Sequence, residues 1–342
     1  MLTYTLYRVN IYVKQGRAYS VKQGGCNMKK AVSIILSLCV VSMAMFAGGE
    51  NEKKSKSLRF AFLPNTQNNT FQSTMNDTFK KLCAEKNIEY TCLDPDYDLN
   101  KQLNQLSDVA TQGYDMVFVI PVDSNGITAG LIELKNAGVP VINVDTSVGK
   151  ADLGLVLSVV ATDCYMAGQL VGQQMVKDFP SGGQIAILDF PSNESCVDRV
   201  NGFLNGLGSN KSKFNITAQQ DGKAALDASL KLAEDIITAN PDLKAFFCIN
   251  DPSALGAAAA VKAANKSGKI KVYSIDASPS GKKALLDGEF AAVAAQVPIE
   301  IVKYAFQQGL DVLSGKQIKN SVYLASHLVS IDEAKKTLND WQ

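Results

Sequence analysis

Histidine and reactive motifs are almost absent from this sequence of 342 residues. His327 is the only histidine, and a single histidine serves a structural role more often than a catalytic one. The chain has no Gly-x-Ser-x-Gly turn, no Gly-rich phosphate loop between a strand and a helix, and no His/Cys spacing that suits a metal. The sequence therefore predicts a protein that is not an enzyme and that uses no cofactor and no metal ion.

The cysteines lack the spacings of a disulfide framework or a zinc site. Five of the seven lie beyond residue 50, an odd number with no Cys-x-x-Cys pair. Most of these five stand in apolar contexts, where cysteine acts as a small buried residue. Cys83 and Cys92 are the one pair close enough in the sequence to bridge, and a disulfide between them stays open here. The five are Cys83, Cys92, Cys164, Cys196 and Cys248.

A net positive charge is lacking once the N-terminal region is set aside. The chain has 34 basic and 33 acidic residues, but six of the basic ones and none of the acidic ones precede Glu50. The remainder has 28 basic and 33 acidic residues, a net charge of −5. A mildly acidic chain is not drawn to nucleic acid or anionic lipid. No DNA-reading helix-turn-helix precedes the first predicted strand, so no nucleic-acid partner is expected.

Residues 28–49 have the three parts of a secretory signal peptide. Lys29 and Lys30 precede an apolar run, residues 31–47, and small residues follow it. The run is seventeen residues long and contains three serines, which suits cleavage better than membrane anchoring. We expect cleavage after Gly49, so that Glu50 begins the mature protein. Residues 1–27 are interpreted as an over-long start upstream of the signal.

Lipid attachment is not expected, because neither cysteine near the signal peptide fits it. Cys39 lies inside the apolar run and follows Leu38, where a small residue is needed. Cys26 has no apolar run before it. The predicted location is therefore the periplasm, as a soluble protein and not a lipoprotein.

From residue 58 on, short apolar runs alternate with amphipathic stretches. Nearly continuous apolar strands between helices are typical of parallel sheets covered on both faces. Ten strands are too many for one sheet in a mature chain of this length, so we expect two consecutive five-strand, doubly wound α/β lobes. The alternation breaks near Asp163, without a flexible linker. The predicted strands are residues 58–63, 88–93, 116–120, 139–144, 155–160, 184–189, 216–219, 245–249, 271–275 and 291–295.

Asn, Asp and Gln recur just after the predicted strands of both halves. Ligands of open parallel sheets bind beyond the carboxyl ends of the strands. A single such residue often caps the next helix, and Asp123 and Asp251 are interpreted in that way. Recurrence at one edge of both halves favours a binding site whose amides, carboxylates and arginine pair with sugar hydroxyls. The candidates are Asn69, Phe71, Gln72, Asp145, Thr146, Arg199, Asn250, Asp276 and Gln296.

Several segments resemble the periplasmic ribose-binding protein family, whose type I fold is shared with the ligand-binding halves of the lactose-repressor group. The resemblance extends over residues 58–329 and implies that most of these candidates contact a ligand. It also implies a three-segment hinge near Thr162, Gln296 and Ala325. The lobes would then be residues 58–162 plus 297–325 and residues 163–296 plus 326–342. The segments are NNTF (68–71), PVINVD (140–145), DRVNGF (198–203), FFCIND (246–251) and AAQVP (294–298).

Three positions depart from the pattern of the ribose binders. Gln72 stands where that family has a second aromatic residue, Thr146 where it has an arginine, and Ala224 where it has an aromatic that stacks on the sugar. Aromatic faces contribute much of the affinity for sugars. The ligand class is therefore open between a pentose, a hexose, a polyol, a nucleoside and a furanosyl signal. The aromatic residues that could replace a lost wall are Phe190, Tyr165 and Tyr97.

The predicted function is capture of a monosaccharide or similar polyhydroxy ligand by closure of the two lobes. The protein is expected to be a monomer that delivers the ligand to the permease of an ABC transporter. Two alternatives stay open: a receptor that signals to a chemoreceptor or sensor kinase, and a binder of a nucleoside or furanosyl signal. Asp145 and Asp276 could also be read as the acid/base pair of a glycosidase, but hydroxyl acceptors are the simpler interpretation.

Overall fold

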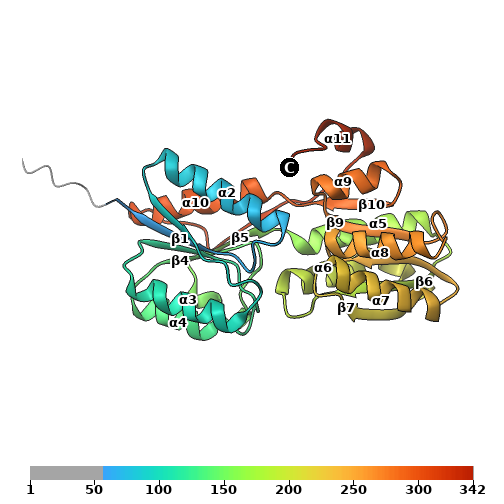
Figure 1. Ribbon diagram of the computed structural model, residues 1–342, viewed down its shortest axis with the longest axis horizontal. Coiled ribbons are helices and arrows are strands. Elements are labelled where there is room, and N and C mark those ends of the chain that lie inside the picture. Colours follow the sequence, from blue (N-terminus) through green and yellow to red (C-terminus); the bar gives the residue numbers. More distant parts are fainter. Residues whose placement is uncertain (1–56, 342) are drawn as a thin grey trace, which may run out of the picture. The chain divides into compact units, whose positions relative to one another are not determined.

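The computed structural model describes residues 57–341, which form two separate parallel sheets flanked by helices (Figure 1). The strands are β1 Arg59–Leu63, β2 Glu89–Cys92, β3 Met116–Val119, β4 Val141–Val144, β5 Ser158–Thr162, β6 Gly183–Asp189, β7 Phe214–Asp221, β8 Leu243–Cys248, β9 Lys271–Asp276, β10 Ala292–Ala295 and β11 Ser321–Leu324. The helices are α2 Thr70–Glu85, α3 Leu99–Thr111, α4 Thr128–Asn136, α5 Cys164–Asp178, α6 Glu194–Gly206, α7 Leu226–Ala239, α8 Asp251–Ala263, α9 Pro279–Leu286, α10 Pro298–Leu313 and α11 Ile331–Lys336. Two short 3₁₀ turns are η1 Lys150–Leu155 and η2 Gly208–Lys213. The predicted over-long start (1–27) and signal peptide (28–49) lie outside the described residues.

The two sheets have the same order of strands at their centres. The first sheet runs β11-β5-β4-β3-β1-β2 and the second runs β10-β9-β8-β6-β7. In each sheet the first strand of the lobe, β1 or β6, has the next strand of the chain on one side and a later strand on the other. The order of strands across the sheet therefore switches between β1 and β3 and between β6 and β8. Crevices at such switch points are where open α/β sheets bind ligands. The predicted fold of two doubly wound parallel-sheet lobes is confirmed.

Strands that are buried on both faces could be recognised from the sequence, whereas the edge strand could not. Every residue of β3, β4 and β5 is buried, because helices cover both faces of the sheet, so these strands read as continuous apolar runs. Strand β11 lies at the edge of the first sheet, and its side chains alternate between exposed and half-buried. The prediction of five strands for the first lobe was wrong for this reason: the sixth strand is short, half-polar and at an edge.

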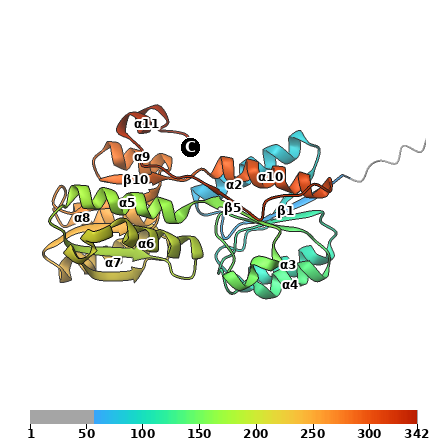
Figure 2. The same cartoon turned by 180° about the vertical axis from the view of Figure 1, so that it is seen from behind.

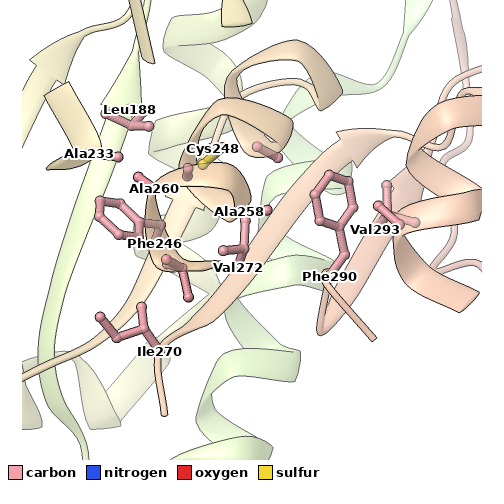
Figure 3. Packing of buried hydrophobic residues seen from close by; sticks show 14 of the residues in the cluster. Leu188, Ala233, Phe246, Cys248, Ala258, Ala260, Ile270, Val272, Phe290 and Val293 are labelled. Carbon is pink, nitrogen blue, oxygen red and sulfur yellow. The ribbon is translucent and has the colours of Figure 1, made fainter. Parts of the chain in front are cut away.

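Each sheet is packed against helices on both faces (Figures 1 and 2). In the first lobe, α2 and α10 lie on one face and α3 and α4 on the other. In the second lobe, residues of α7, α8 and α9 pack on one face of the sheet. Figure 3 shows the strand residues of this face, among them Leu188, Phe246, Val272 and Val293. Residues of α5 and α6 pack on the other face. No helix within residues 57–341 has the length and apolar content needed to cross a bilayer.

Helices α5 and α6 approach each other unusually closely through glycines. A Cβ atom added to Gly168 would lie 2.0 Å from the carbonyl oxygen of Arg199, and one added to Gly202 would lie 2.0 Å from that of Tyr165. Real Cβ atoms essentially never come so near to backbone, so only glycine allows this spacing. The close contact fixes the position of the helix that carries Arg199.

The chain crosses from one lobe to the other in three segments. The first follows β5, which ends at Thr162 in the first sheet, and leads into α5 of the second lobe. The second follows β10 and leads into α10, which packs on α2. The third follows β11, makes an antiparallel bridge from Leu328 to Ala294 of the second sheet, and leads into α11, which packs on α9. The lobes are thus connected by ordered backbone at three places.

Candidate functional site

A cavity with an empty volume of about 410 Å³ lies at the carboxyl ends of the strands of both sheets. All nine candidates named from the sequence line it: Asn69, Phe71, Gln72, Asp145, Thr146, Arg199, Asn250, Asp276 and Gln296. The structure therefore brings these residues together, while their role as ligand contacts stays a prediction. The further lining residues are Asn65, Tyr97, Phe190, Asn193, Ser195, Cys196 and Ala224.

The first lobe contributes a helix start and a strained loop. Asn69 caps α2 by accepting a hydrogen bond from the backbone N–H of Phe71 at 2.8 Å. Asp145 follows β4 with φ = 61°, in the left-handed region. Asn143 holds this loop, because its Nδ2 donates to the carbonyl of Thr146 at 2.7 Å and its Oδ1 accepts from the N–H of Val148 at 3.0 Å. Strained backbone of this kind needs such support and is concentrated at functional sites.

The second lobe contributes a buried charge pair. Arg199 on α6 lies 3.6 Å from Asp276 (Nη1 to Oδ1), and both side chains are about 5% exposed. Nη1 of Arg199 also donates to the carbonyl of Ile249 at 2.7 Å. Asp276 accepts from Nε2 of Gln296 at 2.6 Å and from the N–H of Asp251 at 3.2 Å. Its φ of 131° is again positive, so both carboxylates of the cavity sit on strained backbone.

Five buried polar atoms of the lining residues have no hydrogen-bond partner within the described chain. Four are acceptors, namely Asn65 Oδ1, Gln72 Oε1, Asp145 Oδ1 and Gln296 Oε1, and one is a donor, Nε of Arg199. The amide nitrogens of Gln72 and Gln296 face Asp145 and Asp276, which fixes their oxygens as the free groups. An unpaired buried polar atom costs about 1–3 kcal/mol. The cavity is therefore built to accept hydrogen bonds from something rich in donors.

Burial sets the protonation of the two site carboxyls. It raises the pKa of Asp145 to about 6, although the positive charge of Arg199 opposes the shift. Burial also raises the pKa of Asp276, again against Arg199. The neighbouring Asp251 has its pKa raised to about 7, first by burial and then by the charge of Asp276. The unliganded site thus destabilises its own negative charge.

The affinity for a hydroxylated ligand is expected to fall as the pH drops below 6. The ionised carboxylate of Asp145 is the better acceptor for ligand hydroxyls, so binding at low pH must release a proton. The dissociation constant should rise by up to about tenfold per pH unit below pH 6. Calorimetry between pH 5 and pH 7.5, in buffers of different ionisation enthalpy, measures both the affinity and the proton released.

The unliganded protein should show the opposite trend for this group. A raised pKa means that the native state holds a proton that the unfolded chain has lost, so stability falls as pH rises from about 4 to about 6. The variant Asp145→Asn is the control, because it cannot titrate at this position and should make both profiles less steep, leaving the part due to Asp251 and Asp276. If the affinity stays constant down to pH 5, ligand binding is not coupled to loss of a proton from Asp145.

Residues of the α6 start were missed by the sequence reasoning. Asn193, the N-cap of α6, donates through Nδ2 to Oγ1 of Thr146 at 3.1 Å, and Ser195 Oγ lies 3.2 Å from the same atom. Nearby, the hydroxyl of Ser124 accepts from the N–H of Glu194 at 3.1 Å. An asparagine before a helix reads as a simple cap. The only signal was its place shortly after β6, at the same sheet edge as the other candidates.

Other expectations had mixed outcomes. Tyr97 and Phe190 line the cavity, whereas Tyr165 does not and is 41% exposed. Cys83 and Cys92 are both free thiols, and no disulfide joins them. Asp251 does more than begin a helix, since it donates its N–H to Asp276.

Within residues 57–341, no group of His, Cys, Asp and Glu side chains is arranged to hold a metal ion.

The chain is similar along most of its length to known proteins whose names or structures record a bound sugar or cyclic polyol. The ribose import binding protein of Bacillus subtilis (strain 168) is 28% identical over 304 residues, which cover 86% of this chain and 97% of that protein. A crystal structure from Mycobacterium smegmatis in complex with β-D-fucofuranose has a TM-score of 0.78 at 25% identity and covers 82% of this chain and 94% of that one. The Caulobacter myo-inositol binding protein, bound to myo-inositol, has a TM-score of 0.77 at 26% identity and covers 82% and 96%.

The family model described as a periplasmic binding protein domain matches residues 60–317, most of the described chain. The resemblance inferred from the strand-end motifs is confirmed by this match and by the similarity to the ribose import binding protein. This chain belongs to the periplasmic binding protein family.

Proposed function

We propose that this protein captures a small, neutral, polyhydroxylated ligand, a monosaccharide or cyclic polyol, and delivers it to the permease of an ABC importer. The observation that carries the proposal is the set of four unpaired acceptors and one unpaired donor in a cavity lined from both sheets. Hydroxyl groups both donate and accept, so a polyol satisfies such a set with one ligand. Relatives that bind ribose, fucofuranose and myo-inositol support the same ligand class.

Charge and shape narrow this class. The cavity has two carboxyls and one guanidinium, Asp145, Asp276 and Arg199, so a phosphorylated or carboxylated ligand would meet net negative charge. Phe71, Tyr97 and Phe190 supply aromatic surface, against which the C–H groups of a sugar ring can pack. Ala224 and Thr146 are small and leave room beside them. These features favour a neutral ring.

We further propose that the site does no chemistry on this ligand. Asp276 is held by Arg199, Gln296 and the backbone of Asp251, which suits a fixed acceptor rather than a group that transfers protons. The family is a ligand-binding one. Incubation of the protein with the bound sugar and with its methyl glycoside, followed by chromatography, should return both unchanged.

The proposed mechanism is closure about the three crossing segments, with hinge points near Thr162, Gln296 and Ala325. One lobe would be residues 58–162 plus 297–325, and the other residues 163–296 plus 326–342. A ligand that touches both lobes stabilises the closed state differentially, as a population shift requires. Hydrogen bonds from the start of α6 would add to closure, because the N–H of Glu194 donates to Oγ of Ser124 and Nδ2 of Asn193 donates to Oγ1 of Thr146. The protein would act as a monomer in the periplasm, after removal of residues 28–49.

Thermal-shift and calorimetric screening tests the proposal. At least one of D-ribose, L-arabinose, D-galactose and myo-inositol should bind with a micromolar or lower dissociation constant, and glucose 6-phosphate should not bind. Adenosine is included because a nucleoside was an open alternative. Exclusive binding of the phosphorylated sugar would contradict the proposal. Co-purification of the loaded protein with its permease, rather than with a chemoreceptor or sensor kinase, would separate transport from signalling.

A further inference from the structure

Trp341, the only tryptophan in the sequence, packs behind the cavity. Its ring lies 5.4 Å from that of Phe71 between centroids, at an interplanar angle of 78°, an edge-to-face contact. Phe71 lines the cavity and is only 4% exposed. Trp341 is partly buried against the hydrophobic cluster of the first lobe that contains Phe71 and Met75. It therefore forms a second aromatic layer behind the wall of the ligand site.

The chain that leads to Trp341 is held by the other lobe. Helix α11, just before it, packs on α9. Lys282 of α9 is fully buried, and its Nζ donates to Oγ1 of Thr337 at 3.1 Å and to the carbonyls of Thr337 and Asp340. A buried ammonium group needs such acceptors. The residues that precede Trp341 are thus fixed to the second lobe, while the indole itself contacts the first.

We propose that residues 337–341 act as a clasp between the lobes and that Trp341 is a positioning residue for ligand binding. Edge-to-face contact with Trp341 restricts the Phe71 ring to the orientation that faces the ligand. The contact joins elements of different lobes and is present without a ligand, so it restrains the lobes from opening. The clasp therefore couples the order of the aromatic wall to closure. This inference rests on the proposed function, since it gives Phe71 a ligand to contact.

The first test compares affinities for D-ribose and myo-inositol. Trp341→Ala should raise the dissociation constant about tenfold, because both the ordering of Phe71 and one lobe-lobe contact are lost. Trp341→Phe keeps an aromatic edge and should stay within about threefold of the wild type. Tyr304→Ala, which removes an aromatic ring of α10 that is 49% exposed, is the matched control and should change nothing. Equal affinities of Trp341→Ala and the wild type would overturn the proposal.

Lys282→Met removes the side chain that holds residues 337–340 on α9. It tests the clasp without a change to Trp341, so the test does not depend on the folding of the tryptophan variants. It should raise the dissociation constant as Trp341→Ala does, and the double variant should be no worse than either single one, because both changes release the same clasp. Fully additive effects would instead show that Trp341 acts without its tether to α9 and would overturn the clasp.

A ligand-free measurement separates failure of the clasp from failure of the proposed function. Trp341 is the only indole of the sequence, so with excitation at a wavelength that tyrosine does not absorb, acrylamide quenching reports on that site alone. Phe71→Ala should raise the quenching constant about twofold and shift the emission to longer wavelength. If no sugar binds to the wild type, the proposed function fails while this result still decides the clasp. Unchanged emission in Phe71→Ala would overturn the proposal.

Discussion

Replacement of Asp276 by alanine is expected to lower the free energy of unfolding by about 3–5 kcal/mol and to abolish measurable ligand binding. The change leaves the Arg199 guanidinium buried without its 3.6 Å partner, and arginine cannot escape the cost by losing its proton. Gln296 and the N–H of Asp251 lose their acceptor as well. Urea unfolding gives the stability, and calorimetry with the best ligand of the screen gives the affinity.

The reciprocal change is expected to be milder for stability. In Arg199→Met the carboxyls of Asp145 and Asp276 remain, and they can take up protons because burial already raises the pKa of each. Binding should still be lost. The asymmetry between the two variants is the signature of a buried pair in which only one partner can be neutralised. Equal stability losses in both would contradict it.

A control for the Asp276 variant comes from the same edge of the other sheet. Asp123 accepts from the N–H groups of Asn125 and Gly126 and does not line the cavity. Asp123→Ala should lower stability by about 1 kcal/mol, as loss of a turn or cap does, with the affinity within about twofold. A comparable loss of binding in both aspartate variants would show that damage to the fold, not to the site, is being measured.

Gly168→Ala is expected to be a strongly damaging substitution although it lies outside the cavity. The added Cβ would lie 2.0 Å from the carbonyl of Arg199 and 2.8 Å from the N–H of Phe203. Backbone cannot yield as a flexible side chain does, so α5 and α6 must separate. We expect a stability loss of at least about 1–3 kcal/mol, the usual cost of overpacking. The affinity should fall more than tenfold, because Arg199 moves with α6.

Two further glycines make this prediction sharp. Gly202→Ala, on the facing helix, meets the carbonyl of Tyr165 at 2.0 Å and should reproduce the effect. Gly154→Ala has no atom within 4 Å of its new Cβ and should leave both stability and affinity unchanged, within about 0.5 kcal/mol. Wild-type stability in Gly168→Ala, measured by urea unfolding, would mean that the helices are not held at this spacing in solution.

Much of the fold could be predicted because its strands are covered on both faces. Buried strands such as β3 and β4 consist wholly of buried residues, so they stand out as short apolar runs between helices. Strand β11 was not recognised, since an edge strand needs no such run. The candidate residues could be predicted to lie together because parallel strands place their carboxyl ends at one edge: Asp145 follows β4 directly, Asn250 lies two residues after β8, and Asp276 ends β9.

The rest of the site depends on tertiary packing that no local pattern records. Asn193 and Ser195 reach the cavity because α6 starts against the loop of Thr146. Trp341 contacts Phe71 from a segment that Lys282 holds on α9. The positive φ angles of Asp145 and Asp276 were likewise invisible, because neither residue is glycine. The periodicity of a sequence indicates which face of a helix or strand is buried, but not which distant element packs against that face.

The edge position of β11 bears on the order in which the lobes can form. All strands of the second sheet come from one continuous stretch, β6 to β10, whereas the first sheet takes β11 from far along the chain and packs α2 against α10. A chain that emerges amino-end first can therefore complete the second sheet while the first sheet still lacks a strand and one of its covering helices. The sheet that is begun first is finished last, which delays formation of the cavity until almost the whole chain is present.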